Sequence, residues 1–125
     1  MADSIEPQAI VDRQIDAFNR RDIETIMSLY TEDIEVYEFP STLLYRGATA
    51  LRDYFGACFE EPHLKAYRLT TMVVEPRQTV IAMLRIDRTF PEGAGWIGLA
   101  MIYEVRGGRI ARAWSITGDK VLDRS

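Results

Sequence analysis

From residue 64 onward the hydrophobic pattern of this chain has the period of strands, whereas most of the chain before it has the period of helices, and this change restricts the fold more than any other feature. Before it, apolar residues recur at the spacing of amphipathic helices over residues 4–20, 23–30 and 48–60. After it, runs rich in β-branched and aromatic residues predict strands over residues 64–74, 79–90, 96–105 and 109–117. Helices followed by meandering strands are typical of an α+β domain, with helices packed on one face of a curved antiparallel sheet. The chain has 125 residues, 47% of them hydrophobic, so we expect a single domain over residues 1–125.

A further strand is predicted over residues 33–40, and it carries the most informative carboxylate. Side chains alternate along a strand, so Glu38 shares a face with Ile34 and Val36. On an apolar face a carboxylate loses hydration, which disfavours its charged form and suits it to act as a general base. The alternative is a strand-end Glu38 that bends into solvent or pairs with an arginine.

Two other strands suggest that the sheet encloses a space. In the last strand small side chains share one face, which would leave volume unfilled; they are Ala111, Ala113, Ser115 and Thr117. In the strand over residues 79–90, Arg85 and Asp87 fall on one face with Ile81, Met83 and Thr89. An arginine and an aspartate can be buried at low cost only where each satisfies the other, so we expect this pair to face the space. The alternative is a hydrated pair at the end of the sheet.

Composition argues against several classes of function. The net charge is −4 and no basic stripe forms, so nucleic acid is not an expected partner. No apolar run is long enough to span a membrane and no signal pattern opens the sequence, so we expect a cytoplasmic protein without membrane attachment. Cys58 and His63 are the only residues of their types, which excludes a Cys/His metal cluster. Without a phosphate loop or a dinucleotide fingerprint, no cofactor is indicated.

Several short motifs along the chain together resemble one known superfamily. They are Ala17-Phe18-Asn19, Asp22, Leu29-Tyr30, Glu32-Asp33, Glu38-Phe39-Pro40, Gly47, Leu51, Tyr54-Phe55, the run from Tyr103 to Ile110, and Trp114. The pattern resembles the nuclear transport factor 2-like superfamily, in its SnoaL-like and ketosteroid isomerase-like branches. The resemblance implies a cone, in which three N-terminal helices pack on a strongly curved mixed sheet around a ligand cavity. Members of this superfamily differ widely in activity, and some have none, so the resemblance indicates a fold more than a function.

The resemblance to ketosteroid isomerases also implies roles for single residues. Glu38, two positions before Pro40, matches the general base. The tyrosine and the protonated aspartate that hold the dienolate oxygen in those enzymes correspond to Gln14 and Met101. Because one such donor is typically worth about 10²–10³ in rate, steroid isomerisation by that mechanism is not expected. Tyr30 matches a tyrosine that supports the oxyanion tyrosine, or is a core aromatic residue.

A second branch, the limonene epoxide hydrolases, resembles the chain at Arg85-Ile86-Asp87. The second aspartate of those enzymes would fall near Ser115, and the tyrosine and asparagine that position water would fall near Val36 and Glu38. Epoxide hydrolysis would therefore lack one of its carboxylates.

Three hypotheses follow, all with a cavity for a small, largely apolar ligand. The first is an enzyme in which Glu38 transfers a proton on a polyketide-like or terpenoid carbonyl compound, Arg85 stabilises negative charge and Asp87 orients Arg85. The second is a non-catalytic binding or dimerisation domain, and the third is an epoxide hydrolase. We expect the pocket to be lined by Gln14, Phe18, Tyr30, Val36, Phe55, Met83, Met101, Ser115 and Thr117. Because the sheet is apolar on both sides, we also expect a homodimer through its outer face.

Overall fold

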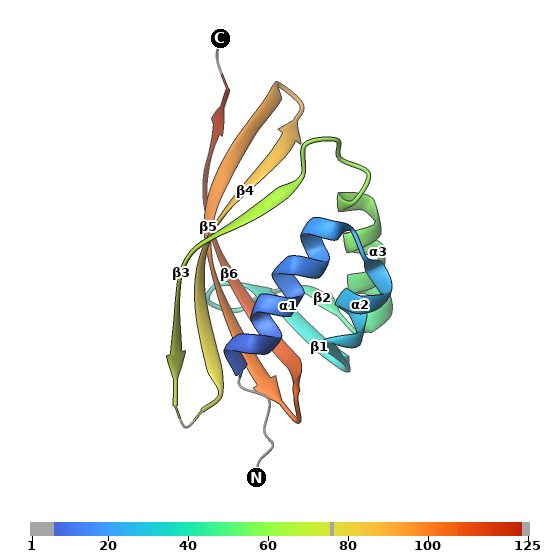
Figure 1. The fold of residues 1–125 in the computed structure, drawn as a ribbon, viewed down its shortest axis with the longest axis vertical. Coiled ribbons are helices and arrows are strands. Elements are labelled where there is room, and N and C mark those ends of the chain that lie inside the picture. Colours follow the sequence, from blue (N-terminus) through green and yellow to red (C-terminus); the bar gives the residue numbers. More distant parts are fainter. Residues whose placement is uncertain (1–6, 76, 124–125) are drawn as a thin grey trace.

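A computed structural model describes residues 7–75 and 77–123 and has three helices on one face of a curved six-stranded sheet (Figure 1). The fold is α+β, as predicted. The strand order is β2-β1-β6-β5-β4-β3, in which β1 and β6 are parallel and the other neighbours are antiparallel. The elements in chain order are α1 (Pro7–Arg20), α2 (Ile23–Ser28), β1 (Tyr30–Glu38), β2 (Thr42–Arg46), α3 (Ala48–Cys58), β3 (Lys65–Val74), β4 (Thr79–Phe90), β5 (Gly93–Arg106) and β6 (Arg109–Leu122).

Helix α1 lies across the sheet with an apolar stripe facing it. The buried side chains of the helix are Ile10, Val11, Gln14, Ile15, Ala17 and Phe18. At its C-terminal end Asn19 pairs with the backbone of β3, because its amide donates to the Ala66 carbonyl at 2.9 Å and accepts from the Ala66 N–H at 2.7 Å. The first positions of the predicted helix, residues 4–6, lie outside the described residues.

Helix α2 is shorter than the sequence pattern predicts. Asp22 caps it, since its Oδ1 accepts a hydrogen bond from the Thr25 N–H at 3.1 Å. The helix ends at Ser28, and Tyr30 begins β1. The backbone explains the early end: the Leu29 carbonyl accepts from the Ile110 N–H at 2.8 Å, and Tyr30 pairs with Ile110 on β6.

Strands β5 and β6 form a long hairpin around a tight turn. Gly107 and Gly108 have φ values of 60° and 81°, and two positive φ values are the signature of the type I′ turn that the Gly-Gly pair predicts. The hairpin continues beyond the predicted end at residue 117, because β6 remains paired with β5 through Leu122, opposite Gly95. The C-terminal segment from residue 118 is therefore strand up to residue 122, and residues 124–125 lie outside the described part.

The core fills the space between the helices and the sheet at the turn end of this hairpin. Its fully buried members come from both layers: Ile10, Val11, Ile26, Ile34, Val80 and Ile110. Burying one such side chain stabilises the fold by roughly 1.5–3 kcal/mol, which holds this end of the sheet against α1 and α2. Within residues 7–75 and 77–123, no helix is long and apolar enough to cross a membrane.

Candidate functional site

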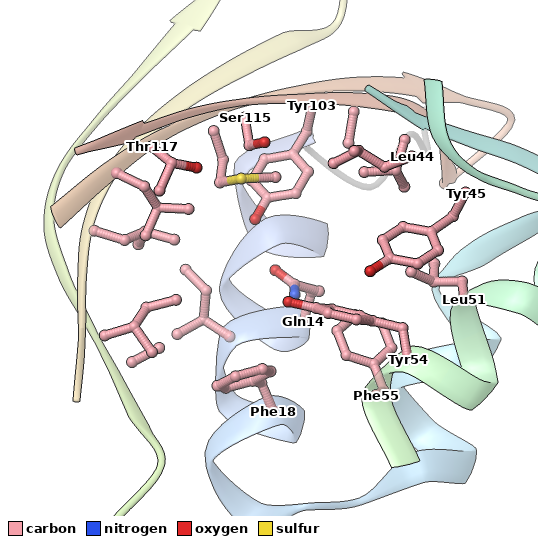
Figure 2. A pocket seen from close by; sticks show the side chains of 18 of the residues that line it. Gln14, Phe18, Leu44, Tyr45, Leu51, Tyr54, Phe55, Tyr103, Ser115 and Thr117 are labelled. Atoms are coloured by element: carbon pink, nitrogen blue, oxygen red, sulfur yellow. The ribbon is translucent and has the colours of Figure 1, made fainter. Parts of the chain in front are cut away.

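Beyond the core the helices and the sheet enclose a cavity of about 230 Å³ (Figure 2). Side chains from α1 and α3 form one wall, and the concave face of the sheet forms the other. Most of the lining is apolar or aromatic. Its main members are Gln14, Phe18, Tyr30, Val36, Glu38, Leu44, Tyr45, Leu51, Tyr54, Phe55, Leu84, Ile86, Arg88, Leu99, Met101, Tyr103, Ala113, Ser115 and Thr117.

Glu38 reaches the cavity through strand register. It is the register partner of Ser115 on β6, and Ser115 is in turn the partner of Met101 on β5. All three side chains line the cavity. Since neighbouring strands lie about 4.8 Å apart, the row places Met101 about 10 Å from Glu38 along the wall, measured between backbones. Glu38 is half-buried, on the face that it shares with the buried Ile34 and with Val36.

Short side chains on the concave face of β4 and β6 leave room for the cavity. Ala113 and Ser115 on β6 and Ala82 on β4 are buried, and the first two line the cavity. The Ser115 hydroxyl donates to the Tyr37 carbonyl at 3.4 Å, so part of its hydrogen-bonding capacity goes to the sheet itself. The inward face predicted for the last strand is thus the one that faces the helices.

The expected pocket residues meet around this cavity, with one exception. Eight line it: Gln14, Phe18, Tyr30, Val36, Phe55, Met101, Ser115 and Thr117. Met83 does not, because β4 turns its odd-numbered side chains to the outer face, where Met83 is 43% exposed. Leu84, Ile86 and Arg88 line the cavity in its place.

The same alternation makes the expected position of Arg85 and Asp87 wrong. They pair with each other, Nε to Oδ1 at 3.1 Å, but on the outer face of the sheet. There the Arg85 guanidinium lies 4.7 Å from the ring centre of Trp96, which holds it by a cation–π contact. Arg85 and Asp87 therefore do not face Glu38, and the arrangement that resembled limonene epoxide hydrolases is not present around the cavity. A better signal existed in the sequence, since the even-numbered residues from 80 to 86 are all apolar.

Arg88 is a cavity residue that the sequence analysis missed. Its side chain extends from β4 toward the end of α3, where Nε donates to Glu61 Oε1 at 3.2 Å and Nη2 contacts Cys58 Sγ at 3.7 Å. The hydrogen bonds that Arg88 donates to Glu61 raise the pKa of the Arg88 guanidinium above its ordinary value. Burial opposes ionisation of Glu61, yet the bonds from Arg88 hold the pKa of this carboxyl below its ordinary value. The pair is therefore ionic at neutral pH.

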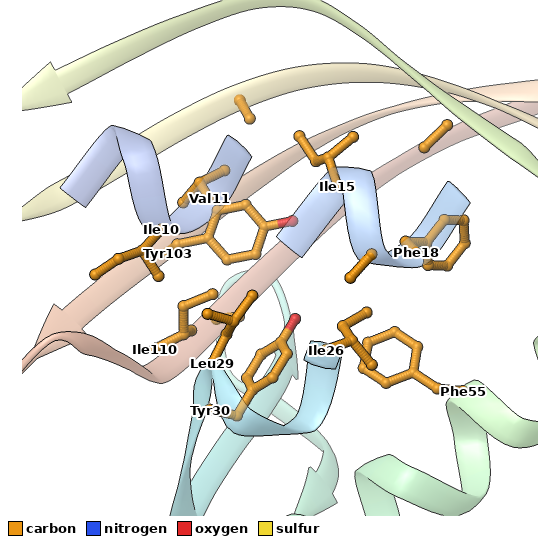
Figure 3. Packing of buried hydrophobic residues seen from close by; sticks show 14 of the residues in the cluster. Ile10, Val11, Ile15, Phe18, Ile26, Leu29, Tyr30, Phe55, Tyr103 and Ile110 are labelled. Atoms are coloured by element: carbon orange, nitrogen blue, oxygen red, sulfur yellow. The ribbon is translucent and has the colours of Figure 1, made fainter. Parts of the chain in front are cut away.

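Four tyrosine side chains add hydroxyl groups to the same cavity: Tyr30, Tyr45, Tyr54 and Tyr103. The sequence analysis expected only Tyr30 there. Tyr30 and Tyr103 are nearly fully buried, with rings packed among aliphatic core residues (Figure 3), and Tyr54 extends from α3. Burial raises the pKa of Tyr30, Tyr54 and Tyr103 above the ordinary range. Neighbouring tyrosines raise the pKa of Tyr30 and Tyr103 further, and Cys58 and Tyr45 do the same for Tyr54. These hydroxyls consequently stay protonated and can donate hydrogen bonds inside the cavity.

Gln14 stands beside these phenols. It is 6% exposed, and its amide group points into the pocket (Figure 2). The nearby Gln14 side chain partly offsets the rise that burial causes in the Tyr30 pKa. Gln14 Oε1 is buried and has no hydrogen-bond partner among the described residues. Across these residues, no group of three or more His, Cys, Asp or Glu side chains is arranged to hold a metal ion.

A curved mixed sheet that closes with three helices around an apolar cavity defines the nuclear transport factor 2-like class of fold, and the comparisons agree. The family model for the SnoaL-like domain matches residues 11–113, and the chain belongs to this family. A comparison with curated proteins finds no match.

Solved structures of similar fold cover almost the whole chain. One is an uncharacterized cystatin fold protein from Novosphingobium aromaticivorans, with a TM-score of 0.80 and 18% identity over 90% of this chain and 99% of that chain. Another is SalBIII, an epoxide hydrolase/cyclase-like enzyme with a role in pyran ring formation in the polyether salinomycin, with a TM-score of 0.77 and 16% identity over 90% of each chain. A candidate polyketide cyclase from Sinorhizobium meliloti has a TM-score of 0.70 and 20% identity over 86% of this chain and 93% of that chain. At these identities the likeness establishes the fold alone.

Proposed function

We propose that this SnoaL-like protein is an enzyme that transfers a proton on a small, apolar carbonyl compound of polyketide or terpenoid type, with Glu38 as the general base. The observation that carries the proposal is the position of Glu38, a carboxylate in the wall of a largely apolar cavity. The similar structures described as a candidate polyketide cyclase and an epoxide hydrolase/cyclase-like enzyme support the substrate class.

In the proposed step the Glu38 carboxylate removes a proton from the carbon next to the carbonyl group. The electron pair of the C–H bond forms a carbon–carbon double bond, and the carbonyl π pair moves to oxygen to give an enolate. Where a carbon–carbon double bond adjoins the deprotonated carbon, the enolate extends over it as a dienolate. Glu38 then returns the proton to the far carbon of that double bond, and the product is an isomer with no net change in atoms or charge. Tyr54 and Tyr103, neutral phenols in the cavity, are the donors we propose for the enolate oxygen. They take the role first assigned to Arg85, which lies outside the cavity.

Non-catalytic binding of the same ligands is the second candidate. It is favoured by Gln14 and Met101, which both line this cavity. The resemblance to ketosteroid isomerases matches these two residues to the oxyanion donors of those enzymes, and neither is a tyrosine or an aspartate here. Epoxide hydrolysis is not retained, because the Arg85–Asp87 pair on which it depended faces away from the cavity.

The test is proton exchange on a compact ketone. In deuterium oxide, the wild-type protein should accelerate replacement of the α-protons of 2-tetralone, followed by NMR. Glu38→Gln should lower that rate by about 10²–10⁴, the usual contribution of a general base. Glu35→Gln is the matched control, since Glu35 lies on the same strand and its Oε1 accepts from Tyr37 on the opposite face.

Wild-type exchange in the Glu38→Gln protein would reject Glu38 as the base. If 2-tetralone instead binds the wild-type protein at one site without faster exchange, non-catalytic binding becomes the better account.

A further inference from the structure

We infer that the ligand of this cavity carries a hydroxyl group, which donates a hydrogen bond to Gln14 Oε1 at the wall formed by α1. This inference rests on the proposed function only in taking the cavity as the substrate site. An oxyanion hole supplies hydrogen-bond donors to the ligand, whereas Gln14 Oε1 supplies an acceptor.

The unpaired amide oxygen of Gln14 is the main observation. Gln14 is more than nine-tenths buried, lines the cavity, and its Oε1 has no partner in the described part of the chain. Leaving a buried acceptor unsatisfied costs about 1–3 kcal/mol. A ligand hydroxyl that donates to Gln14 Oε1 removes this cost and therefore binds more tightly than a ligand without a donor.

Neighbouring phenols define the surroundings of this acceptor. The Gln14 side chain lies close enough to Tyr30 to lower its pKa, against the effect of burial. Tyr54 and Tyr103 stay protonated, so a hydroxyl bound to Gln14 can also accept a hydrogen bond from a phenol. A hydroxyl group, which both donates and accepts, fits this surrounding better than an ether or a carbonyl group, which only accept.

The size and lining of the cavity restrict the rest of the ligand. Its volume of about 230 Å³ lies below the ~300–1,000 Å³ typical of small-molecule sites. A cavity of this size suits a compact ligand, such as a two-ring molecule. Phe18, Leu51 and Phe55 supply apolar contacts around it. The ligand class is therefore a compact two-ring compound that carries a hydroxyl group in addition to the carbonyl group of the proposed substrate.

Three naphthalene probes of nearly equal shape test the anchor. Titration calorimetry should show that the wild-type protein binds 2-naphthol about tenfold more tightly than 2-methylnaphthalene, as expected for one satisfied buried acceptor. The ether 2-methoxynaphthalene, which cannot donate, should bind no better than 2-methylnaphthalene. In Gln14→Met, an apolar replacement of similar length, the preference for 2-naphthol should disappear. Gln8→Met, at a glutamine of the same helix that does not line the cavity, should keep it.

Several results would overturn the inference. They are failure of 2-naphthol to bind, equal affinity of the wild-type protein for the naphthol and the hydrocarbon, and a methyl ether that binds as tightly as the naphthol, which would mean that Gln14 donates. The wild-type comparison is decisive even if Gln14→Met fails to fold. The naphthalene probes have no carbonyl group and therefore no α-proton for Glu38 to remove. The preference for 2-naphthol and the effect of Glu38→Gln on 2-tetralone exchange can thus fail independently.

Discussion

Arg88 and Glu61 form a partly buried ion pair beside the cavity. Their side chains are 28% and 20% exposed, so water screens the pair less than the exposed ion pairs elsewhere. Glu61 also accepts from the Thr89 N–H at 3.3 Å, which ties the segment after α3 to the end of β4. The pair therefore connects α3 to β4 at one side of the cavity, where Arg88 also contacts Cys58.

Replacing Glu61 by glutamine should destabilise the protein at neutral pH and not at acid pH. The pKa of Glu61 is lower in the folded chain than its ordinary value of 4.5, so its contribution is present above that pH. It is lost as the pH falls through the folded-state pKa. Urea unfolding should give a deficit of about 1–2 kcal/mol for Glu61→Gln at pH 7, which shrinks toward pH 3. Glu32→Gln, at an exposed position on β1, is the control; a deficit independent of pH would contradict this account.

The alternation of side chains along the strand predicts the face of Glu38 correctly, whereas the face of Arg85 was predicted wrongly. Ile34, Val36 and Glu38 share a face by strict alternation, and strand pairing with β6 keeps that alternation through Glu38. Strand β4 has two faces, and its charged pair favoured the face with Arg85 as the inward one. Burial follows the more uniformly apolar face, so Arg88 rather than Arg85 reaches the cavity. The unpaired oxygen of Gln14 has no sequence signal, because it depends on how the amide meets Tyr30.

The β5–β6 hairpin is longer than the sequence pattern predicts. Gly95 and Gly118 are residues of a type common in turns, yet both lie within strands. A Cβ atom at Gly95 would stand 2.3 Å from the Val121 carbonyl oxygen, and one at Gly118 would stand 3.0 Å from the Gly98 carbonyl oxygen. The register also shifts between Ile97 and Leu99. Close backbone approach and a bulge therefore let the sheet bend where it encloses the cavity.

Alanine at Gly95 should consequently destabilise the protein, because the added methyl group meets backbone that cannot move independently. We expect a loss of about 1–3 kcal/mol in the free energy of unfolding, measured in urea. Gly56→Ala is a matched control with the opposite sign: a Cβ atom there meets nothing within 4 Å, and alanine in a helix is favoured by about 0.5–1 kcal/mol. A Gly95→Ala protein as stable as the wild type would mean that the end of the hairpin is not held as described.

On the scale of the whole molecule, the outer face of the sheet is apolar and aromatic. Tyr67, Met72, Met83 and Ile116 are exposed there, and Met72 has 62% of its surface accessible. The helices cover only the concave face (Figure 1). An apolar face of this kind on a folded domain favours association, and two copies related by a two-fold axis can cover each other with the same patch.

We therefore propose a homodimer that packs through this outer face. Sedimentation velocity at micromolar concentration should give a dimer. Met83→Glu combined with Ile116→Glu should give a monomer, because each copy would place two unpaired carboxylates in the interface. Leu43→Glu, at an exposed apolar position on β2 away from these residues, should remain dimeric. Because Met83 does not line the cavity, the monomeric variant should keep its preference for 2-naphthol, which separates assembly from ligand binding. A wild-type protein that sediments only as a monomer would rule out this interface.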